Sequence, residues 1–374
     1  MRFIDEFRQP ALARALASKI QKWPGPPVQI MEVCGTHTVA IFRHGLRGLL
    51  PPQVNLLSGP GCPVCVTPNA EIDKAIALAT NPKVILATFG DMMRVPGSYS
   101  SLAEAKAQGA QVRVVYSATE ALEMALDNPE KAVVFFGVGF ETTAPTTAAC
   151  ILEAERLGLK NFYFLSVHKV VPPAMKALLQ SGEVRIDGFL CPGHVSAIIG
   201  SRPYEFIPRD YGIPCVIAGF EPVDILQAIA MILEMRAEGR AEVAIQYRRV
   251  VRPEGNPSAL WAIARVFQVS DSEWRGLGLI PSSGLRLGLG MDRFAVEERF
   301  EIKVRPAKQV ADCRCGDILR GLCPPPECRL FGTACTPEHA VGPCMVSSEG
   351  TCAAWFLYSA GGRIGGASAV EAGA

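Results

Sequence analysis

The sequence predicts an α/β protein with two similar parallel-sheet domains, followed by a mixed region that carries an iron–sulfur cluster near the C-terminal end. From about residue 28 to 235, short runs rich in Val, Ile, Leu and Phe alternate with Gly/Pro/Thr loops and helix-like stretches. This alternation is typical of parallel strands that helices cover on both faces. Seven of the 13 cysteines lie in the last sixth of the chain, which sets that part apart from the sheets.

The bulk composition bounds the class of protein. The 374 residues are 49% hydrophobic and 20% charged, and 37 basic against 36 acidic residues give a formal charge of +1. No net field therefore attracts nucleic acid or anionic lipid. The N-terminus lacks the apolar core of a signal peptide, and no uncharged run approaches the roughly 20 residues of a membrane span. We expect a cytoplasmic protein that binds neither nucleic acid nor membrane.

Eight apolar runs are the expected strands. In chain order they are residues 28–33, 54–58, 84–89, 112–116, 132–138, 162–167, 188–191 and 215–220. A break at 127–130 divides them into two groups of four, so we expect α/β domain I over 28–128 and α/β domain II over 129–222. A single eight-stranded (β/α) barrel needs the same number of units, although the irregular first units, with their extra Pro-rich loop, argue against it.

The two ends of the chain are predicted to be helical. Residues 1–27 are expected to form a helical extension, because apolar residues from Phe3 and Ile4 to Ile20 recur with a helical period. Residues 223–374 are predicted to be a mixed helical region that ends in a cluster-binding segment, 313–352. We expect the N-terminal extension to pack on this region.

Cysteine usage indicates chemistry rather than disulfides, because a cytosolic chain keeps its thiols reduced. Cys34, Cys62 and Cys65 stand in two Gly/Pro-rich loops near the start, far in sequence from the C-terminal thiols. The distribution predicts two separate thiol sites. Three further cysteines lie in apolar surroundings and are expected to be inert: Cys150, Cys191 and Cys215.

The first loop reads Cys34-Gly35-Thr36-His37-Thr38 at the end of the first strand. A helix that begins here places backbone amides near the sulfur, which favours the thiolate. His37 is close enough to act as a base, a hydrogen-bond partner or a ligand. The loop indicates a nucleophilic or metal-binding cysteine, and the alternative is a buried thiol beside an N-capping threonine.

The second loop, Gly59 to Pro68, contains the C-x-x-C pair Cys62 and Cys65 before a helix-like stretch. Adjacent thiols in such a turn can close a disulfide, and one pKa is often lowered. The pair also suits half of a metal site. Structural zinc needs a second pair of ligands, and none stands near in sequence, so redox or transient metal work is the favoured interpretation.

The C-terminal cysteines are widely spaced in a Gly/Pro-rich coil, which suits the wrapping of a [4Fe–4S] cluster by loops. The spacing matches neither the ferredoxin patterns nor the paired knuckles of zinc ribbons. The four predicted cluster ligands are Cys328, Cys335, Cys344 and Cys352. The other three cysteines of this region are expected to serve relay chemistry or packing: Cys313, Cys315 and Cys323.

The sequence resembles the HypD family of [NiFe]-hydrogenase maturation proteins over essentially its whole length. The motifs that carry the resemblance are CGTHT (34–38), GPGCPVC (59–65), GFETTAP (139–145), PGHVS (192–196), GFEPVDIL (219–226) and CMVSSEG (344–350). The resemblance implies two Rossmann-like domains and one [4Fe–4S] cluster. It also implies a complex with HypC, whose N-terminal cysteine shares the iron, and a cyanide supply from HypE.

The resemblance further implies that Cys34 is a ligand of a transient mononuclear iron that carries cyanide and carbon monoxide. Cys62 and Cys65 then supply a dithiol that ligates or reduces, and His37 belongs to the same site. The protein would be a maturation scaffold with redox activity rather than a conventional turnover enzyme, and it would serve the hydrogenase large subunit indirectly. The alternatives are a [4Fe–4S]-dependent disulfide reductase acting on a protein partner and a zinc-stabilised interaction module.

Overall fold

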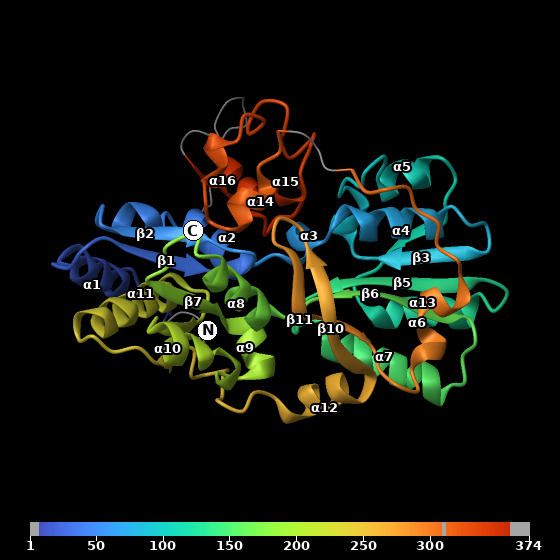
Figure 1. Ribbon diagram of the computed structural model, residues 1–374, viewed down its shortest axis with the longest axis horizontal. Helices are drawn as coiled ribbons and strands as arrows, with labels where there is room; N and C mark the ends of the chain where they lie inside the picture. The colour runs from blue at the N-terminus through green and yellow to red at the C-terminus, as the bar shows by residue number, and fades with distance from the viewer. Residues whose placement is uncertain (1–6, 309–311, 360–374) are drawn as a thin grey trace.

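The structure, a computed structural model, describes residues 7–308 and 312–359. Two parallel sheets lie side by side, and a cysteine-rich C-terminal region sits over the junction between them (Figure 1). The predicted α/β class with two parallel-sheet domains is confirmed. The barrel alternative is wrong, because the eight predicted strands divide between two open sheets.

The first sheet, sheet A, has the strand order β2-β1-β7-β8-β9, and every pairing in it is parallel. Its strands, in chain order, are β1 (Val28–Glu32), β2 (Val54–Ser58), β7 (Gly188–Pro192), β8 (Cys215–Ala218) and β9 (Val243–Ile245). Strand β1 is nearly continuous in buried residues, as expected for an interior strand with helices on both faces. The carboxyl ends of β1 and β7 therefore lie next to one another.

The second sheet, sheet B, has the order β4-β3-β5-β6 and is also parallel throughout. Its strands are β3 (Val84–Thr88), β4 (Val112–Val114), β5 (Ala132–Gly139) and β6 (Phe162–His168). The central strand β5 is the longest of the sheet and is buried over nearly its whole length. Both sheets keep their carboxyl ends free for functional loops.

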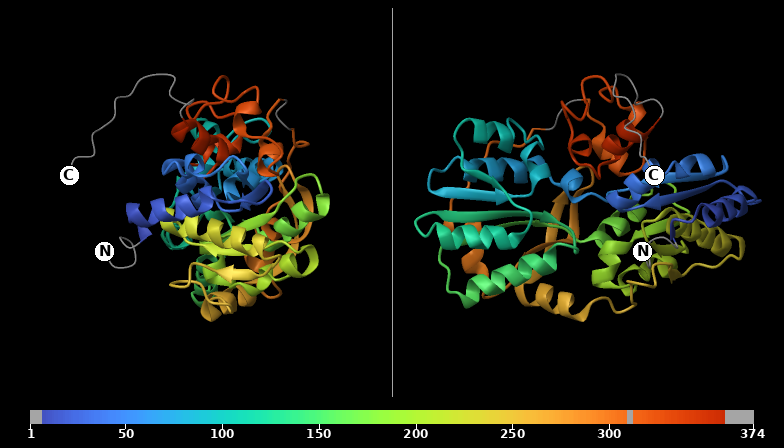
Figure 2. Two further views of the ribbon diagram at one scale, coloured as in Figure 1. Left: turned by 90° about the vertical axis from the view of Figure 1, so that its left-hand side faces the viewer. Right: turned by 180° about the vertical axis from the view of Figure 1, so that it is seen from behind.

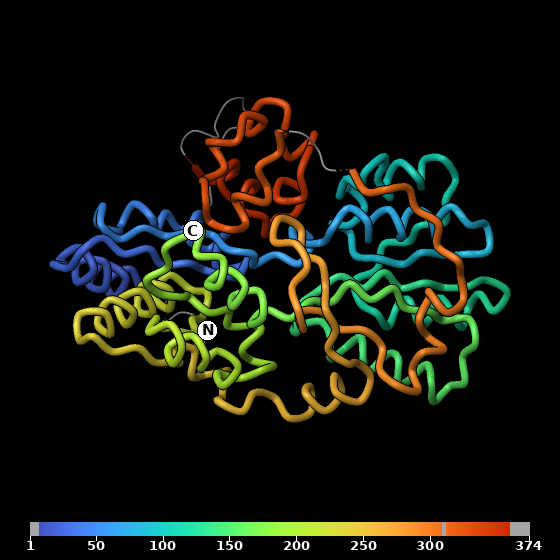
Figure 3. Tube along the Cα trace, in the orientation of Figure 1, coloured from blue at the N-terminus to red at the C-terminus, as the bar shows by residue number. Residues whose placement is uncertain are grey.

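The predicted domain boundary at residue 128 is wrong as a division between the sheets. Residues 28–58 pair with residues 188–245, whereas residues 84–168 form sheet B. The chain leaves sheet A after β2 through α3 (Pro63–Val66) and returns through α8 (Val171–Ser181), as the trace shows (Figure 3). Parallel strands need long crossovers, and a crossover can carry the chain to another sheet, so neighbours in sequence need not be neighbours in a sheet.

Helices cover both faces of the two sheets. They are α2 (Gly35–Arg43), α4 (Asn69–Ala79), α5 (Leu102–Ala107), α6 (Ala118–Asp127), α7 (Ala144–Arg156), α9 (Gly193–Ile199), α10 (Phe206–Tyr211) and α11 (Pro222–Ala237). Short 3-10 turns are η2 (Leu46–Leu49), η3 (Gly90–Met93), η4 (Arg202–Tyr204), η5 (Asp292–Phe294) and η6 (Pro325–Glu327). None of the helices in the described ranges is both long and apolar enough to cross a membrane.

The N-terminal helix α1 (Pro10–Gln21) packs on α11, with Ile20 in one apolar cluster with Ile225 and Ile229. Helix α11 lies within the region 223–374, on which this helix was expected to pack, although it also covers sheet A. The predicted extension begins at residue 1, and Phe3 and Ile4 lie outside the described residues.

The segment between the sheets and the cysteine-rich region contains a β-hairpin that the sequence analysis missed. After α12 (Pro257–Val266), strands β10 (Phe267–Trp274) and β11 (Gly278–Leu287) pair antiparallel. Further helical stretches were expected here, and that expectation is wrong for the hairpin. In β10 only the first and last residues are buried, so the strand offers little apolar periodicity. The hairpin lies between the two sheets (Figure 1).

The C-terminal region is built from short helices and Gly/Pro turns, after α13 (Val296–Arg299) has packed on sheet B. Its helices are α14 (Cys315–Leu319), α15 (Pro343–Val346) and α16 (Thr351–Tyr358). One apolar cluster runs from sheet A through the hairpin into this region and includes Phe189, Trp274 and Cys344. The region is therefore anchored to the sheets rather than tethered, as the two further views also show (Figure 2).

Candidate functional site

Cys34 lies at the carboxyl end of β1 and is the N-cap residue of α2. The second thiol loop lies directly against it, because a Cβ atom on Gly61 would collide with the backbone of Cys34. The amide of Gly35 also donates a 2.9 Å hydrogen bond to the carbonyl of Gly61. The two predicted loops are thus packed together, and Gly61 is glycine because the approach leaves no room for a side chain.

Burial dominates the electrostatics of the Cys34 thiol, which is 7% exposed. Burial raises the pKa of Cys34 to about 12, and the carboxylates of Glu349 and Glu32 act in the same direction. The backbone amides of Thr36 and His37 at the start of α2 lower this pKa, as the sequence predicted, but burial outweighs them. The thiolate therefore requires a cation beside the sulfur, which a bound metal ion would provide.

Glu32 is a site residue that the sequence analysis missed. Its carboxylate is fully buried and accepts a 3.0 Å hydrogen bond from the Cys34 amide and a 2.5 Å hydrogen bond from the Thr38 hydroxyl. Burial raises the pKa of Glu32 to about 7, and the hydrogen bond from Thr38 lowers it. Glu32 thereby fixes the backbone on which Cys34 stands. A lone acid inside the apolar run VQIMEV was the available signal.

His37 is buried beneath the Cys34 loop, with Nε2 2.9 Å from the carbonyl oxygen of Gly219. A carbonyl can only accept, so Nε2 carries the proton and Nδ1 is an acceptor, and Nδ1 is buried without a partner. Burial lowers the pKa of His37 to about 4, which keeps the ring neutral. The ring also lies 4.8 Å from that of Phe220. His37 is therefore neutral, and its ring is held in place near Cys34.

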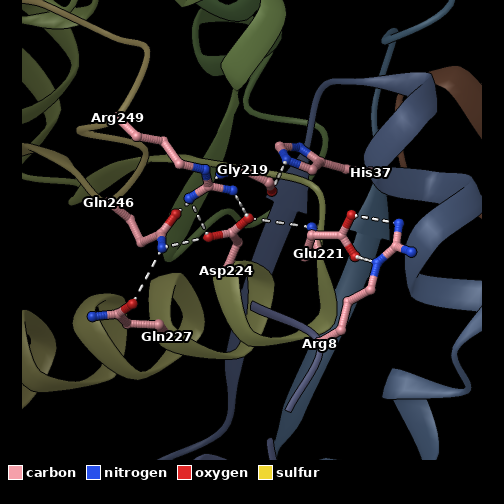
Figure 4. Close-up of polar contacts among 8 residues, drawn as sticks. All are labelled: Arg8, His37, Gly219, Glu221, Asp224, Gln227, Gln246 and Arg249. Atoms are coloured by element: carbon pink, nitrogen blue, oxygen red, sulfur yellow. Dashed lines mark hydrogen bonds and ion pairs between the residues drawn. The ribbon is translucent and has the colours of Figure 1, made fainter. Parts of the chain in front are cut away.

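A polar network supports the strand end that holds His37 (Figure 4). Asp224 accepts a 2.8 Å hydrogen bond from Arg249 and another of 2.8 Å from Gln246, and Gln246 accepts from the amide of Gly219 at 3.1 Å. Asp224 is fully buried, so its ion pair with Arg249 compensates the burial. The network holds Gly219, whose carbonyl oxygen accepts the hydrogen bond from His37.

The C-x-x-C pair forms the start of the short helix α3, where the Cys62 sulfur accepts a 3.3 Å hydrogen bond from the Cys65 amide. Both thiols are buried, with Cys62 3% and Cys65 0% exposed. Burial raises the pKa of Cys65 well above its usual value, and contacts with the thiols of Cys344 and Cys62 add to this. The pair thus faces a thiol of the C-terminal region.

The expectation of two separate thiol sites is wrong. Cys344 contacts the thiols of Cys315, Cys352 and Cys65, and hydrogen bonds from these three lower its pKa. Cys313 in turn contacts Cys315. A continuous chain of thiols therefore runs from the C-terminal region to the loop that lies against Cys34. Sequence separation concealed it, because α15 reaches back across the molecule to α3.

Two further predicted ligands, Cys328 and Cys335, contact chain segments that lie next to Cys313. The Cys328 thiol lies 3.7 Å from the carbonyl of Asp312, and the Cys335 sulfur accepts a 3.3 Å hydrogen bond from the Val341 amide. A Cβ atom on Gly342 would lie 2.8 Å from the Cys313 sulfur, so glycine keeps the space beside that thiol free. Nowhere in 7–308 and 312–359 do three or more metal-ligating side chains already converge on one point. Seven cysteines in one region nevertheless offer more thiols than the four that a [4Fe–4S] cluster takes.

Arg275, in the turn of the hairpin, is a second residue that the sequence analysis missed. Its Nε donates a 2.9 Å hydrogen bond to the carbonyl of Thr67, and its Nη2 is buried without a partner. Burial lowers the pKa of Arg275, and the thiols of Cys315 and Cys344 act against this effect. The guanidinium is therefore a cation placed beside the thiol chain.

A cleft of about 400 Å³ opens beside Cys34 between the two sheets and the C-terminal region. Its lining includes Cys34, Thr36, Phe140, Thr142, His194 and Glu349. The Thr36 hydroxyl donates a 2.7 Å hydrogen bond to Glu349, a residue that the sequence analysis did not single out. The motifs GFETTAP and PGHVS thus contribute to one cleft around Cys34, whereas His168 is buried and lies 3.1 Å from Thr143.

The chain is similar to known proteins over nearly its whole length. Residues 11–359 match the family model described as HypD, hydrogenase formation hypA family. The chain is 51% identical over 367 residues to the hydrogenase expression/formation protein HupD of Azotobacter chroococcum mcd 1, covering 96% of this chain and 97% of the relative. It is 50% identical over 370 residues to the hydrogenase maturation factor HypD of Escherichia coli (strain K12), covering 96% and 98%.

Proposed function

Because this chain belongs to the HypD family of hydrogenase maturation factors, we propose that it is the scaffold and electron relay for assembly of the Fe(CN)₂CO moiety of [NiFe]-hydrogenase. The observation that carries the proposal is the chain of thiols that ends in the loop packed against Cys34. Attaching cyanide and carbon monoxide to iron consumes electrons, and this chain is a route for them. The scaffold and the relay are thus parts of one site.

The iron that is assembled is the cargo of Cys34. Low-spin iron with cyanide and carbon monoxide needs soft thiolate donors in a shielded site. The Cys34 thiol is buried, opens on a cleft and lies against the loop that supplies Cys62 and Cys65. Coordination replaces the thiol proton with a metal ion, which offsets the raised pKa of Cys34.

We propose a change in the set of cluster ligands, with Cys313 in place of Cys344. Cys328, Cys335 and Cys352 stay in the set. Cys313 follows Asp312, whose carbonyl oxygen the Cys328 thiol approaches. The Cys313 sulfur also lies against Gly342, and the residue before Gly342, Val341, donates its amide hydrogen bond to Cys335. Cys344 contacts Cys65 and Cys315 as well as Cys352, so it is the thiol that connects this region to the C-x-x-C pair. A bound [4Fe–4S] cluster would supply single electrons to this region.

The freed thiols Cys344 and Cys315 form a second dithiol that can exchange with the first. The Cys344 thiolate attacks the Cys65 sulfur of a Cys62–Cys65 disulfide and releases Cys62 as a thiolate. Cys315 then attacks Cys344 and releases Cys65, so the disulfide and two electrons change places. Cys344 suits the attack, because the neighbouring thiols lower its pKa. The reduced pair Cys62/Cys65 lies in the loop that packs against Cys34.

The partners follow from the same site. HypC would share the iron through its N-terminal cysteine in the cleft at Cys34, and HypE would deliver cyanide there. The cleft is lined by segments of both sheets and of the C-terminal region, so a partner seated on it would contact all three. The hydrogenase large subunit would receive the iron through such a partner, in the cytoplasm.

A disulfide reductase that acts on a protein partner is the second candidate, and burial disfavours it. Cys62 is 3% and Cys65 0% exposed, whereas exchange with a protein disulfide requires an accessible attacking sulfur. The pair is placed to exchange inside the molecule, with Cys344, rather than with an outside protein.

The test is Cys34→Ala, purified without oxygen together with Cys150→Ala as the matched control. Cys150 lies on α7 and contacts Thr119 rather than the thiol chain. We expect Cys34→Ala to keep the absorbance of the cluster, to lose the infrared bands of iron-bound cyanide and carbon monoxide, and to fail in hydrogenase maturation. The control should keep all three. Maturation by Cys34→Ala would contradict the scaffold role of Cys34.

A further inference from the structure

A second cavity, of about 500 Å³, lies outside the site at Cys34. Three parts of the chain form it: the edge of sheet A with η2, the segment before β7, and the C-terminal region from α14 to α16. The residues that carry the argument are Arg47, Asn55, Ser58 and Trp355. None of them belongs to the thiol chain or to the motifs that the proposed function uses.

Arg47 is a half-buried cation that forms no ion pair among the described residues. Its guanidinium lies over the ring of Phe42 at 4.7 Å and near that of Trp355 at 5.5 Å. Its Nε is buried without a partner, and within the described ranges its side chain makes no hydrogen bond or ion pair. The other arginine that lines the cavity, Arg185, is neutralised, since it pairs with Asp187 at 3.0 Å. Arg47 thus supplies a positive charge of this cavity that no ion pair neutralises within the described ranges.

This arrangement costs stability. Burial lowers the pKa of Arg47, and only Glu32 acts against that effect. Glu32 acts on Arg47 without forming an ion pair with it, since its oxygens accept hydrogen bonds from the Cys34 amide and the Thr38 hydroxyl and none from Arg47. A buried charge that lacks a partner is expensive, and the cation–π contacts return only part of the cost. An anion in the cavity would compensate it.

Ser58 supports the same interpretation independently of Arg47. It is 7% exposed and lines the cavity, and its hydroxyl makes no hydrogen bond of normal geometry, although it lies close enough to Glu32 to lower the pKa of that carboxyl. The amide side chain of Asn55, two residues earlier on β2, lines the cavity as well. A guanidinium, a hydroxyl and an amide together are the donors that recognise the oxygens of a carboxylate or a phosphate.

We infer that this cavity is a binding site for a small oxyanion, a carboxylate or a phosphate, held by Arg47 and Ser58. The guanidinium presents a planar fork that matches two oxygens of such a group. The volume of about 500 Å³ leaves room for a body larger than the anion itself. The rings of Phe42 and Trp355 keep the guanidinium in place.

The position of the cavity gives the ligand a route to the thiols. Ser58 directly precedes the loop that carries Cys62 and Cys65, and Thr351, which also lines the cavity, directly precedes Cys352. A bound oxyanion would therefore join the edge of sheet A to the C-terminal region and hold the two halves of the thiol chain together. The inference does not depend on the family, because it rests on the cavity and its unpartnered donors.

The test is calorimetric titration of the full chain with two probes, inorganic phosphate and malonate. The variants are Arg47→Met and Ser58→Ala, and the matched control is Arg43→Met, at an exposed arginine four residues before Arg47. We expect saturable binding of at least one probe, weakened about tenfold or more in Arg47→Met, as the loss of a charged hydrogen bond implies, and unchanged in the control. The tighter probe identifies the class of ligand.

Two results would overturn the inference. One is the absence of saturable binding of both probes to the unaltered protein at millimolar concentration. The other is equal binding by the unaltered protein and Arg47→Met. If Arg47→Met does not fold, Ser58→Ala and Arg47→Lys decide: Arg47→Lys keeps the charge but loses the fork, so both must bind more weakly for the inference to stand.

Discussion

The thiol of Cys65 donates a 3.9 Å hydrogen bond to the carbonyl oxygen of Pro343, 278 residues further along the chain. The next residue, Cys344, has its own thiol in contact with Cys65. The C-x-x-C loop and the C-terminal region are therefore one thiol system.

Cys313→Ser and Cys344→Ser should have opposite effects on the cluster. Cys313→Ser removes a proposed ligand and should lower the iron and sulfide content and the visible absorbance. Cys344→Ser should keep the cluster but block exchange with Cys62 and Cys65, so that this pair stays oxidised under a reductant that acts through the cluster. Iron analysis and thiol labelling measure the two effects.

The reverse pattern would restore the ligand set expected from the sequence. If Cys344→Ser lost the cluster while Cys313→Ser kept it, Cys344 would be a ligand and Cys313 would not. Cys215→Ser is the control, because its thiol contacts Cys191 in the core of sheet A.

Arg275→Met should lower the reduction potential of the cluster. The guanidinium is a buried cation beside Cys315 and Cys344, and removing a positive charge makes the addition of an electron less favourable. For a one-electron couple about 59 mV corresponds to about 1.4 kcal/mol, so we expect a fall of tens of millivolts in a redox titration. The exposed Arg329→Met should leave the potential unchanged, and an unchanged or raised potential in Arg275→Met would refute the role of Arg275.

Gly35→Ala should disconnect the C-terminal region from the Cys34 loop. A Cβ atom on Gly35 would lie 2.5 Å from the Glu349 Cβ and 2.8 Å from its carbonyl oxygen, so the segments must move apart and strain the bond from Thr36 to Glu349. Such overpacking costs about 1–3 kcal/mol. We expect a lower free energy of unfolding and less iron bound at Cys34. Gly48→Ala, where a Cβ atom meets nothing within 4 Å, is the control, and equal behaviour of both variants would rule out this close contact.

Glu141→Gln should remove a pH dependence of stability. Burial raises the pKa of Glu141 from 4.5 to about 7, so the folded protein holds a proton that the unfolded chain has lost. Its contribution is therefore fully present below pH 4.5 and is lost as the pH rises toward 7. At about 1.4 kcal/mol per pH unit, the loss is up to roughly 3 kcal/mol across this window.

Denaturant unfolding at several pH values measures this difference between the unaltered protein and Glu141→Gln. The unaltered protein should lose stability relative to the variant as the pH rises, because glutamine does not ionise. Glu32 shifts in the same direction but is present in both proteins, so the comparison isolates Glu141. Parallel curves for the two proteins would mean that Glu141 is ionised in the folded state.

The strands could be predicted from the sequence, whereas their grouping could not. All eight predicted runs form strands, because buried parallel strands are continuous apolar segments between Gly/Pro loops. The return of the chain from β6 to β7 depends on pairing between distant residues such as Ile30 and Gly188, which no local pattern records. The hairpin escaped prediction because most of β10 is half-buried or exposed.

The thiol loops of the site could be predicted, but their surroundings could not. Cys34, His37, Cys62 and Cys65 stand in motifs at strand ends, where parallel sheets place functional groups. Arg275 lies in a hairpin turn and Glu349 in a C-terminal turn, with nothing in their neighbours to announce a contact with Cys344 or Thr36. Long-range packing alone brings these charges to the thiols.

The central claim is tested most directly by an infrared spectrum, with iron and sulfide analysis, of the protein purified without oxygen. The account predicts iron beyond that of one [4Fe–4S] cluster, together with the stretching bands of iron-bound cyanide and carbon monoxide. Iron sufficient for the cluster alone, with a spectrum silent in that region, would contradict the scaffold and leave an iron–sulfur redox protein.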